Sequence, residues 1–158
     1  MKLLIPNSTI WCPFDTAESE YVKTFKDNGF NVIHTHIADG GDFFALDTPK
    51  CDYIISNPPY SVKGAVFKRL FEIKKPFAML INIQGLFDNR DRFDLFNKNK
   101  FELLYLNPRV DYQKPFEPSA KSGVPFQSVY VCSGILHKQI DFKYLDKSKA
   151  LGEPTCGN

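Results

Sequence analysis

Residues 52–60 read DYIISNPPY, and this short stretch carries the strongest structural signal in the chain. The apolar run at 53–55 is typical of a parallel strand that is covered on both faces. The strand stops abruptly at Pro58-Pro59, where φ is fixed and two backbone donors are missing. The residue before a proline is pushed away from the helical region, so Asn57 is expected to be extended. The stretch therefore predicts a buried strand that ends in a rigid corner.

Apolar runs alternate with amphipathic stretches on both sides of this corner, which is the pattern of an α/β domain. We expect a Rossmann-like, mostly parallel sheet with helices on both faces and an antiparallel C-terminal strand. Ligands of such sheets bind outside the carboxyl ends of the strands. The expected strands are Ser8–Cys12, Phe30–His36, Cys51–Ser56, Pro76–Ile83, Phe101–Leu106, Gln127–Leu136 and Ile140–Tyr144, and the expected helices are Thr16–Asn28, Val62–Ile73 and Asn89–Asn97.

The length and composition indicate one globular domain that spans residues 1–158, since the chain is 43% hydrophobic and 24% charged. It has no apolar run of about 18 residues that would cross a membrane, and its N-terminal apolar stretch is too short for a signal peptide. The cysteines at 12, 51, 132 and 156 form no Cys-x-x-Cys pair. We therefore expect reduced thiols, no bound metal and a cytoplasmic location.

The corner formed by Asn57, Pro58, Pro59 and Tyr60 offers oxygen atoms to a planar group that bears an NH2. The Asn57 amide oxygen and the Pro58 carbonyl can each accept one amino hydrogen, which makes the nitrogen lone pair a better nucleophile. The Tyr60 ring can stack on the same planar group and hold it. A proline turn that only ends a strand is the alternative interpretation.

Asn-Pro-Pro-Tyr between a buried strand and a helix resembles the catalytic motif of S-adenosylmethionine-dependent amino-methyltransferases. That family acts on adenine N6 in DNA or RNA and on glutamine in release factors. The resemblance covers about residues 8–136, and the segments FAML (77–80) and FQSVY (126–130) are similar to small phage-type adenine methyltransferases. It implies a class I methyltransferase fold, S-adenosyl-L-methionine as the cofactor, and catalytic roles for Asn57, Pro58, Pro59 and Tyr60.

The segment after the first expected strand stands where this family has its first cofactor loop. Pro13 and Phe14 fit the family pattern, but the usual glycines are replaced by the sequence DTAES at 15–19. The resemblance implies that Asp15 binds the ammonium of the methionine moiety and that Ser19 reaches its carboxylate. A helix N-cap at Asp15 or Thr16 is the alternative.

Two further segments resemble cofactor-binding motifs. His36 and Ile37 end the second expected strand, where the family binds the ribose hydroxyls and packs an apolar residue against adenine. An ordinary surface or core histidine is the alternative for His36. Asp42 and Phe43 stand where the family accepts the adenine amino group and flanks its ring, although residues 38–42 also read as a plain turn. Asn57 is expected to contact the cofactor as well.

Charge is distributed unevenly, with a net of −4 over residues 1–60 and +6 over residues 61–158. A basic second half hints at a polyanionic partner, and an ordinary solvated surface is the alternative. Cations at the expected carboxyl edge of the sheet and in the long loop at 107–126 are the candidates for phosphate contacts. They are Lys63, Arg90, Arg92, Arg109, Lys114 and Lys121.

The expected activity is therefore methyl transfer to adenine N6 in DNA, without a metal. The chain has no room for a separate target-recognition domain, which leaves three possibilities: it reads little sequence, a partner subunit or a homodimer supplies target recognition, or it acts on structured RNA. Three alternatives remain open: RNA adenine as acceptor, protein glutamine as acceptor, and a degenerate fold that binds cofactor or a partner without turnover.

Overall fold

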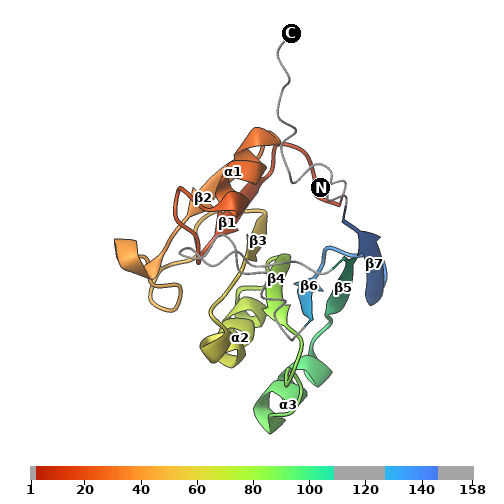
Figure 1. Ribbon diagram of the computed structural model, residues 1–158. Helices are drawn as coiled ribbons and strands as arrows, with labels where there is room; N and C mark the ends of the chain where they lie inside the picture. The colour runs from red at the N-terminus through yellow and green to blue at the C-terminus, as the bar shows by residue number, and fades with distance from the viewer. Residues whose placement is uncertain (1–2, 109–126, 146–158) are drawn as a thin grey trace, which may run out of the picture.

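The structure, a computed structural model, describes residues 3–108 and 127–145 and is an α/β domain (Figure 1). In chain order its elements are β1 (Thr9–Cys12), α1 (Glu20–Asp27), β2 (Asn31–His34), the 3-10 helix η1 (Ile37–Asp39), β3 (Tyr53–Ser56), the 3-10 helix η2 (Tyr60–Val62), α2 (Lys63–Ile73), β4 (Phe77–Asn82), α3 (Arg90–Lys98), β5 (Glu102–Asn107), β6 (Ser128–Ser133) and β7 (Ile140–Tyr144).

The described strands form one mixed sheet in the order β2-β1-β3-β4-β6-β5-β7. β2, β1, β3 and β4 are parallel to one another, and β7 is parallel to β5. β6 runs antiparallel to both β4 and β5, between which it is inserted. A mostly parallel sheet with one late antiparallel strand is therefore confirmed, although that strand is β6 and not the last strand, β7.

The two faces of the sheet carry separate hydrophobic clusters because successive side chains of a strand point to opposite faces. Trp11, Ile54 and Met79 pack with α2 and α3 on one face. Ile10 and Ile55 pack with α1 on the other face. Figure 1 shows α1 on one side of the sheet and α2 and α3 on the other, which confirms the prediction of helices on both faces.

Helix α1 begins at Glu20, four residues later than the sequence indicates. The N–H of Thr16 donates to the Ser19 hydroxyl (3.1 Å), which closes a turn before the helix. Ser19 is the N-cap residue, with extended dihedrals and no capping bond from its side chain. The alternative prediction of an N-cap at Asp15 or Thr16 is therefore wrong.

Three described cysteines, Cys12, Cys51 and Cys132, are buried free thiols, and Cys156 lies outside the described residues. Burial raises the pKa of each of these three thiols, which keeps them protonated and unreactive. Within residues 3–108 and 127–145, no helix has the length and apolar character that a membrane crossing requires.

Candidate functional site

The corner directly follows β3, a fully buried strand in the interior of the sheet. All four residues of β3 are buried, because the strand lies between β1 and β4 and is covered on both faces. Pro58 is also buried, whereas Pro59 and Tyr60 reach the surface. Tyr60, which is 41% exposed, opens the 3-10 turn η2 that leads into α2. The predicted rigid corner is therefore present, and the core holds its base in place.

Asn57 is the unusual residue of this corner. Its side-chain oxygen Oδ1 is buried and has no hydrogen-bond partner in the described structure. Buried polar atoms are nearly always paired, because leaving one unpaired costs about 1–3 kcal/mol. An unpaired buried acceptor beside a pocket is typical of a group that is reserved for a ligand.

A cavity of about 740 Å³ opens beside the corner, at the carboxyl ends of β1 and β3. This volume lies within the range of about 300–1,000 Å³ that is usual for small-molecule sites. The cavity brings together most of the predicted site residues, from four separate segments. It is lined by Pro13, Phe14, His36, Ile37, Gly41, Asp42, Phe43, Phe44, Asn57, Pro58, Pro59, Tyr60, Ser61 and Val62.

Aromatic rings form the inner wall of this cavity. The centroid of the Phe43 ring lies 5.0 Å from that of Phe14, 5.3 Å from that of Phe44 and 5.5 Å from that of Trp11. Phe43 is only 2% exposed, so it forms the floor of the cavity and is also part of the core. Phe44 is much more exposed and stands at the rim.

Arg69, a residue that the sequence analysis did not assign to the site, holds this aromatic wall in place. The guanidinium of Arg69 on α2 lies over the Phe43 ring, 5.3 Å from its centroid. Arg69 also donates to the backbone carbonyls of Phe44 and Leu46. The arginine therefore fixes the turn at 42–46 against α2.

Asp15 and Ser19, which were predicted to bind the cofactor, do not line the cavity. Asp15 is 6% exposed, and its carboxylate accepts a hydrogen bond from the Ser56 hydroxyl, which in turn accepts from the N–H of Phe14. Burial raises the pKa of Asp15, while hydrogen bonds from Ser56 and Ser19 oppose that shift. Asp15 therefore ties the loop after β1 to the last residue of β3, a tertiary role that its place in the sequence did not indicate.

His36 lies at the cavity, but β2 ends at His34 and does not reach it. His36 is the N-cap of η1, and its Nδ1 accepts a hydrogen bond from the N–H of Ala38 (3.1 Å). Nε2 is thus the ring nitrogen left for a ligand. Ile37, next to it, is 73% exposed at the rim of the cavity.

Asp42 lies on the cavity wall, and one of its carboxylate oxygens, Oδ1, already accepts a hydrogen bond within the protein. That oxygen accepts from the N–H of Phe44 (2.9 Å), which stabilises the turn locally.

Gly41 lines the cavity, although the sequence analysis treated it only as part of a plain turn. A Cβ at Gly41 would lie 2.9 Å from the Cβ of Thr35 and 3.0 Å from the backbone nitrogen of His36, so only glycine fits.

Two of the cations predicted to contact nucleic acid, Lys63 and Arg92, lie close together beside the loop after β4. The Lys63 ammonium donates to the carbonyl of Gln84 (2.9 Å), and Arg92 donates to the carbonyls of Leu86 (3.0 Å) and Gly85 (2.8 Å). Both side chains thus hold the loop after β4. Burial lowers the pKa of Lys63, and the nearby charge of Arg92 lowers it further.

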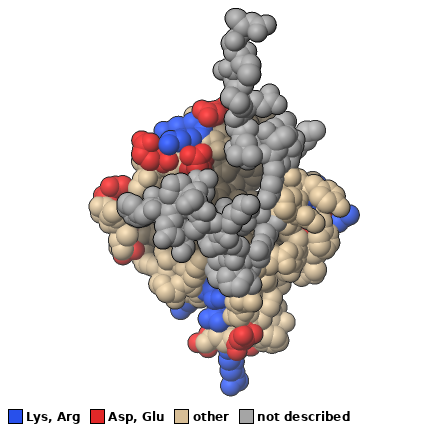
Figure 2. Space-filling view, in the orientation of Figure 1, with Lys and Arg blue, Asp and Glu red and all other residues tan. Residues whose placement is uncertain are grey.

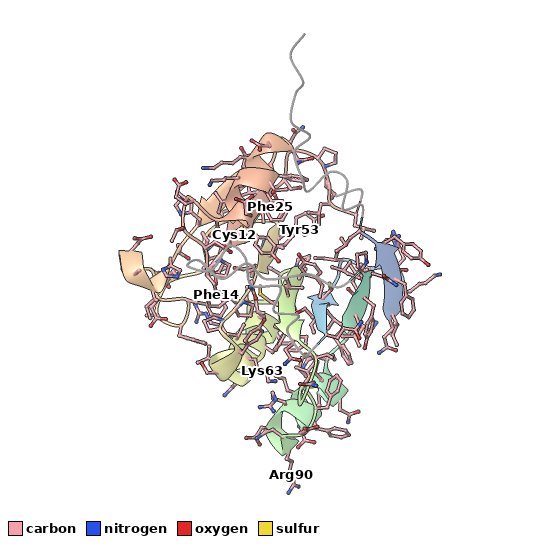
Figure 3. All side chains as sticks on the ribbon, in the orientation of Figure 1. Cys12, Phe14, Phe25, Tyr53, Lys63 and Arg90 are labelled. Carbon is pink, nitrogen blue, oxygen red and sulfur yellow. The ribbon has the colours of Figure 1, made fainter. Side chains whose placement is uncertain are left out.

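Arg90 lies at the outer end of α3 and points away from the body of the molecule (Figure 3). Figure 2 shows basic and acidic side chains close together near α1 and near α3, with no continuous basic face among the described residues on this side. Arg109, Lys114 and Lys121 lie outside the described residues. The described part of the chain also contains no cluster of three or more histidine, cysteine or acidic side chains that would bind a metal.

No protein-family model matches the chain, and no curated protein sequence matches it.

Proposed function

We propose that the protein is an S-adenosyl-L-methionine-dependent methyltransferase that acts on an exocyclic amino group, with adenine N6 in DNA as its first candidate acceptor. The observation that carries the proposal is the unpaired, buried Oδ1 of Asn57 at the edge of an aromatic-lined cavity. An amino group is the complementary donor for such an acceptor. The resemblance of residues 57–60 to the amino-methyltransferase motif supports the same interpretation.

The residues that line the cavity support S-adenosyl-L-methionine as the proposed cofactor. Phe14, Phe43 and Ile37 supply flat or apolar surface for an adenine ring, while Asp42 and Nε2 of His36 supply polar atoms for its amino group and the ribose hydroxyls. The bound cofactor supplies an activated methyl group on a sulfonium. A late antiparallel strand in a mostly parallel sheet also agrees with the fold that the resemblance implies.

On this proposal the corner residues orient the acceptor and do not act as a strong base. The amide oxygen of Asn57 and the carbonyl of Pro58 accept the two amino hydrogens, which directs the nitrogen lone pair toward the methyl group. Tyr60 stacks on the heterocycle. Because Pro58 and Pro59 restrict φ, the acceptors are held before the substrate arrives, and little entropy is lost on binding.

One observation favours a second candidate, a fold that binds cofactor or a partner without turnover. Asp15 was expected to anchor the methionine ammonium, but its carboxylate is buried and bonded to Ser56. With no glycine-rich loop in the sequence, the described residues show no other obvious anchor for the amino-acid part of the cofactor. RNA adenine and protein glutamine remain alternative acceptors for the active enzyme.

The test separates cofactor binding from turnover. Calorimetry measures the binding of S-adenosyl-L-methionine, and a labelled-methyl assay then offers unmethylated DNA, tRNA, ribosomal RNA and a glutamine-containing release-factor peptide. Transfer to DNA supports the first candidate, transfer to another acceptor changes the substrate, and binding without transfer supports the second candidate. Absence of cofactor binding contradicts the proposed methyltransferase and leaves only the partner-binding form of the second candidate.

Two variants test the assigned roles. We expect Asn57→Ala to lower transfer on the order of 10²–10³-fold, as when an enzyme loses a preorganised hydrogen-bonding group, with little change in cofactor affinity. Asn89→Ala is the matched control, since Asn89 caps α3 and is not among the residues that line the cavity. We expect Asp42→Ala to weaken cofactor binding, and unchanged affinity would remove Asp42 from the site.

A further inference from the structure

Strand β7 is the outermost strand of the sheet and shows an exposed apolar strip. It pairs with β5 on one side and has no partner strand on its other side among the described residues (Figure 1). Ile140, Phe142 and Tyr144 share one face, and their exposed fractions are 49%, 70% and 90%. An unpaired edge next to large exposed apolar side chains is a surface for strand pairing.

The hydrogen bonds to β5 show which backbone groups of β7 face inward. The carbonyl of Gln139 accepts from the N–H of Leu103 (2.7 Å), and the N–H of Leu145 donates to the carbonyl of Asn107 (2.7 Å). Because backbone groups alternate in direction along a parallel strand, the odd-numbered residues of 139–145 bond to β5.

The backbone groups of Ile140, Phe142 and Tyr144 therefore point away from the sheet. The contact of Phe142 agrees with this direction, since its N–H is held by the side chain of Asp141 (2.9 Å) and not by a neighbouring strand. The outer edge of β7 thus presents donors and acceptors at alternate residues, which is what an additional strand requires.

We propose that the outer edge of β7 pairs with the same edge of a second copy of this chain, antiparallel and centred on Phe142. A two-fold axis at Phe142 places Ile140 opposite Tyr144 of the second copy and Asp141 opposite its Lys143. The residues whose backbone groups point outward then become the hydrogen-bonded pairs. Asp141 and Lys143 fall in the non-hydrogen-bonded pairs, where opposite side chains lie closest.

The charges of β7 match this register. Within one chain the Nζ atom of Lys143 lies 3.7 Å from the Oδ2 atom of Asp141. Both side chains are on the face opposite to Phe142. In the paired arrangement each of them meets the opposite charge of the second copy, so the two copies contribute a cluster of alternating sign. The Asp141 carboxylate leaves the N–H of Phe142, which then donates to the Phe142 carbonyl of the second copy.

This inference does not depend on the proposed methyltransferase activity. The cavity lies at the ends of β1 and β3, and β4, β6 and β5 separate β3 from β7. Pairing through β7 therefore joins two sheets into one and leaves both cavities open.

Sedimentation velocity of the full chain over a range of concentrations tests the proposal. We expect the wild type to dimerise reversibly. Asp141→Lys places lysine opposite lysine, and Lys143→Asp places aspartate opposite aspartate, so each variant alone should weaken dimerisation by about tenfold or more. An equimolar mixture of the two variants restores opposite charges at every pair, and we expect it to form a heterodimer at least as tight as the wild type.

Circular dichroism and thermal melting of each variant show that it is folded, and the mixture tests pairing even where one variant is less stable. A wild-type chain that is monomeric at every concentration overturns the proposal, because another segment then covers the edge or the edge stays bare. A dimer that is insensitive to both charge reversals, or variants that do not associate when mixed, also overturns it.

Discussion

Replacing Asn57 by alanine is expected to stabilise the protein in the absence of ligand. The substitution removes a buried acceptor that has no partner in the described structure. Such an atom costs about 1–3 kcal/mol. The side chain is half-buried beside an open cavity, so its truncation removes few packed apolar contacts. The net change is an increase of about 1 kcal/mol in the free energy of unfolding, or about 2–4 °C in Tm for a chain of this size.

Equilibrium urea unfolding, followed by circular dichroism, measures this difference, and the m-value shows whether both variants unfold in the same way. Asn89→Ala is the control with the opposite expected sign. The Asn89 Oδ1 accepts from the N–H groups of Asp91 (2.9 Å) and Arg92 (3.3 Å), so its loss should cost about 1 kcal/mol. A loss of about 1 kcal/mol or more in Asn57→Ala would show that the amide is satisfied in the folded chain, and the argument for a reserved acceptor would be refuted.

Three further predictions concern the buried contact between Asp15 and Ser56 and the packing of the core. Ser56→Ala removes one of the two side-chain hydrogen bonds to the Asp15 carboxylate and leaves Ser19 as the remaining partner, so it should lower the free energy of unfolding by about 1 kcal/mol in urea titrations. Asp15→Asn should change the pH dependence of stability. The raised pKa means that the folded chain binds the proton of Asp15 more tightly, so the contribution of Asp15 is lost as pH rises from about 4 through its folded pKa. The stability of the asparagine variant relative to wild type should therefore rise over this window and then level off, and a flat difference contradicts the assignment. Phe96→Ala, in the aromatic cluster between α2 and α3, should cost about 3–5 kcal/mol, and a calorimetric loss below 1 kcal/mol would place Phe96 outside the core.

The strands and their approximate places could be predicted from the sequence because apolar runs bounded by proline and glycine are strong local signals. The stretch at 52–60 predicted both β3 and the corner after it. Helix α1 was predicted too long, since residues 16–19 have helical composition but close a turn through Ser19. The order of strands across the sheet was not predictable, because no periodicity shows that β6 lies between β4 and β5.

The candidate site was predictable where local motifs define it and not where long-range contacts do. Asn57, Asp42 and Phe14 were chosen from their segments, and they line one cavity. The pairing of Asp15 with Ser56 joins residues 41 positions apart, which no local pattern reveals. Lys63 likewise carries a charge that suggests a phosphate contact, while its ammonium donates to a backbone carbonyl.

The insertion of β6 between β4 and β5 has a consequence for biosynthesis. During translation β1, β2, β3 and β4 leave the ribosome first, and their parallel pairing in the finished sheet requires no later strand. β5 follows, but it does not contact β4 in the finished sheet and has no strand to bind until Ser128–Ser133 has been synthesised. The edge of β4 and the facing edge of β5 therefore both stay open until β6 has left the exit tunnel, and this late strand closes both at once.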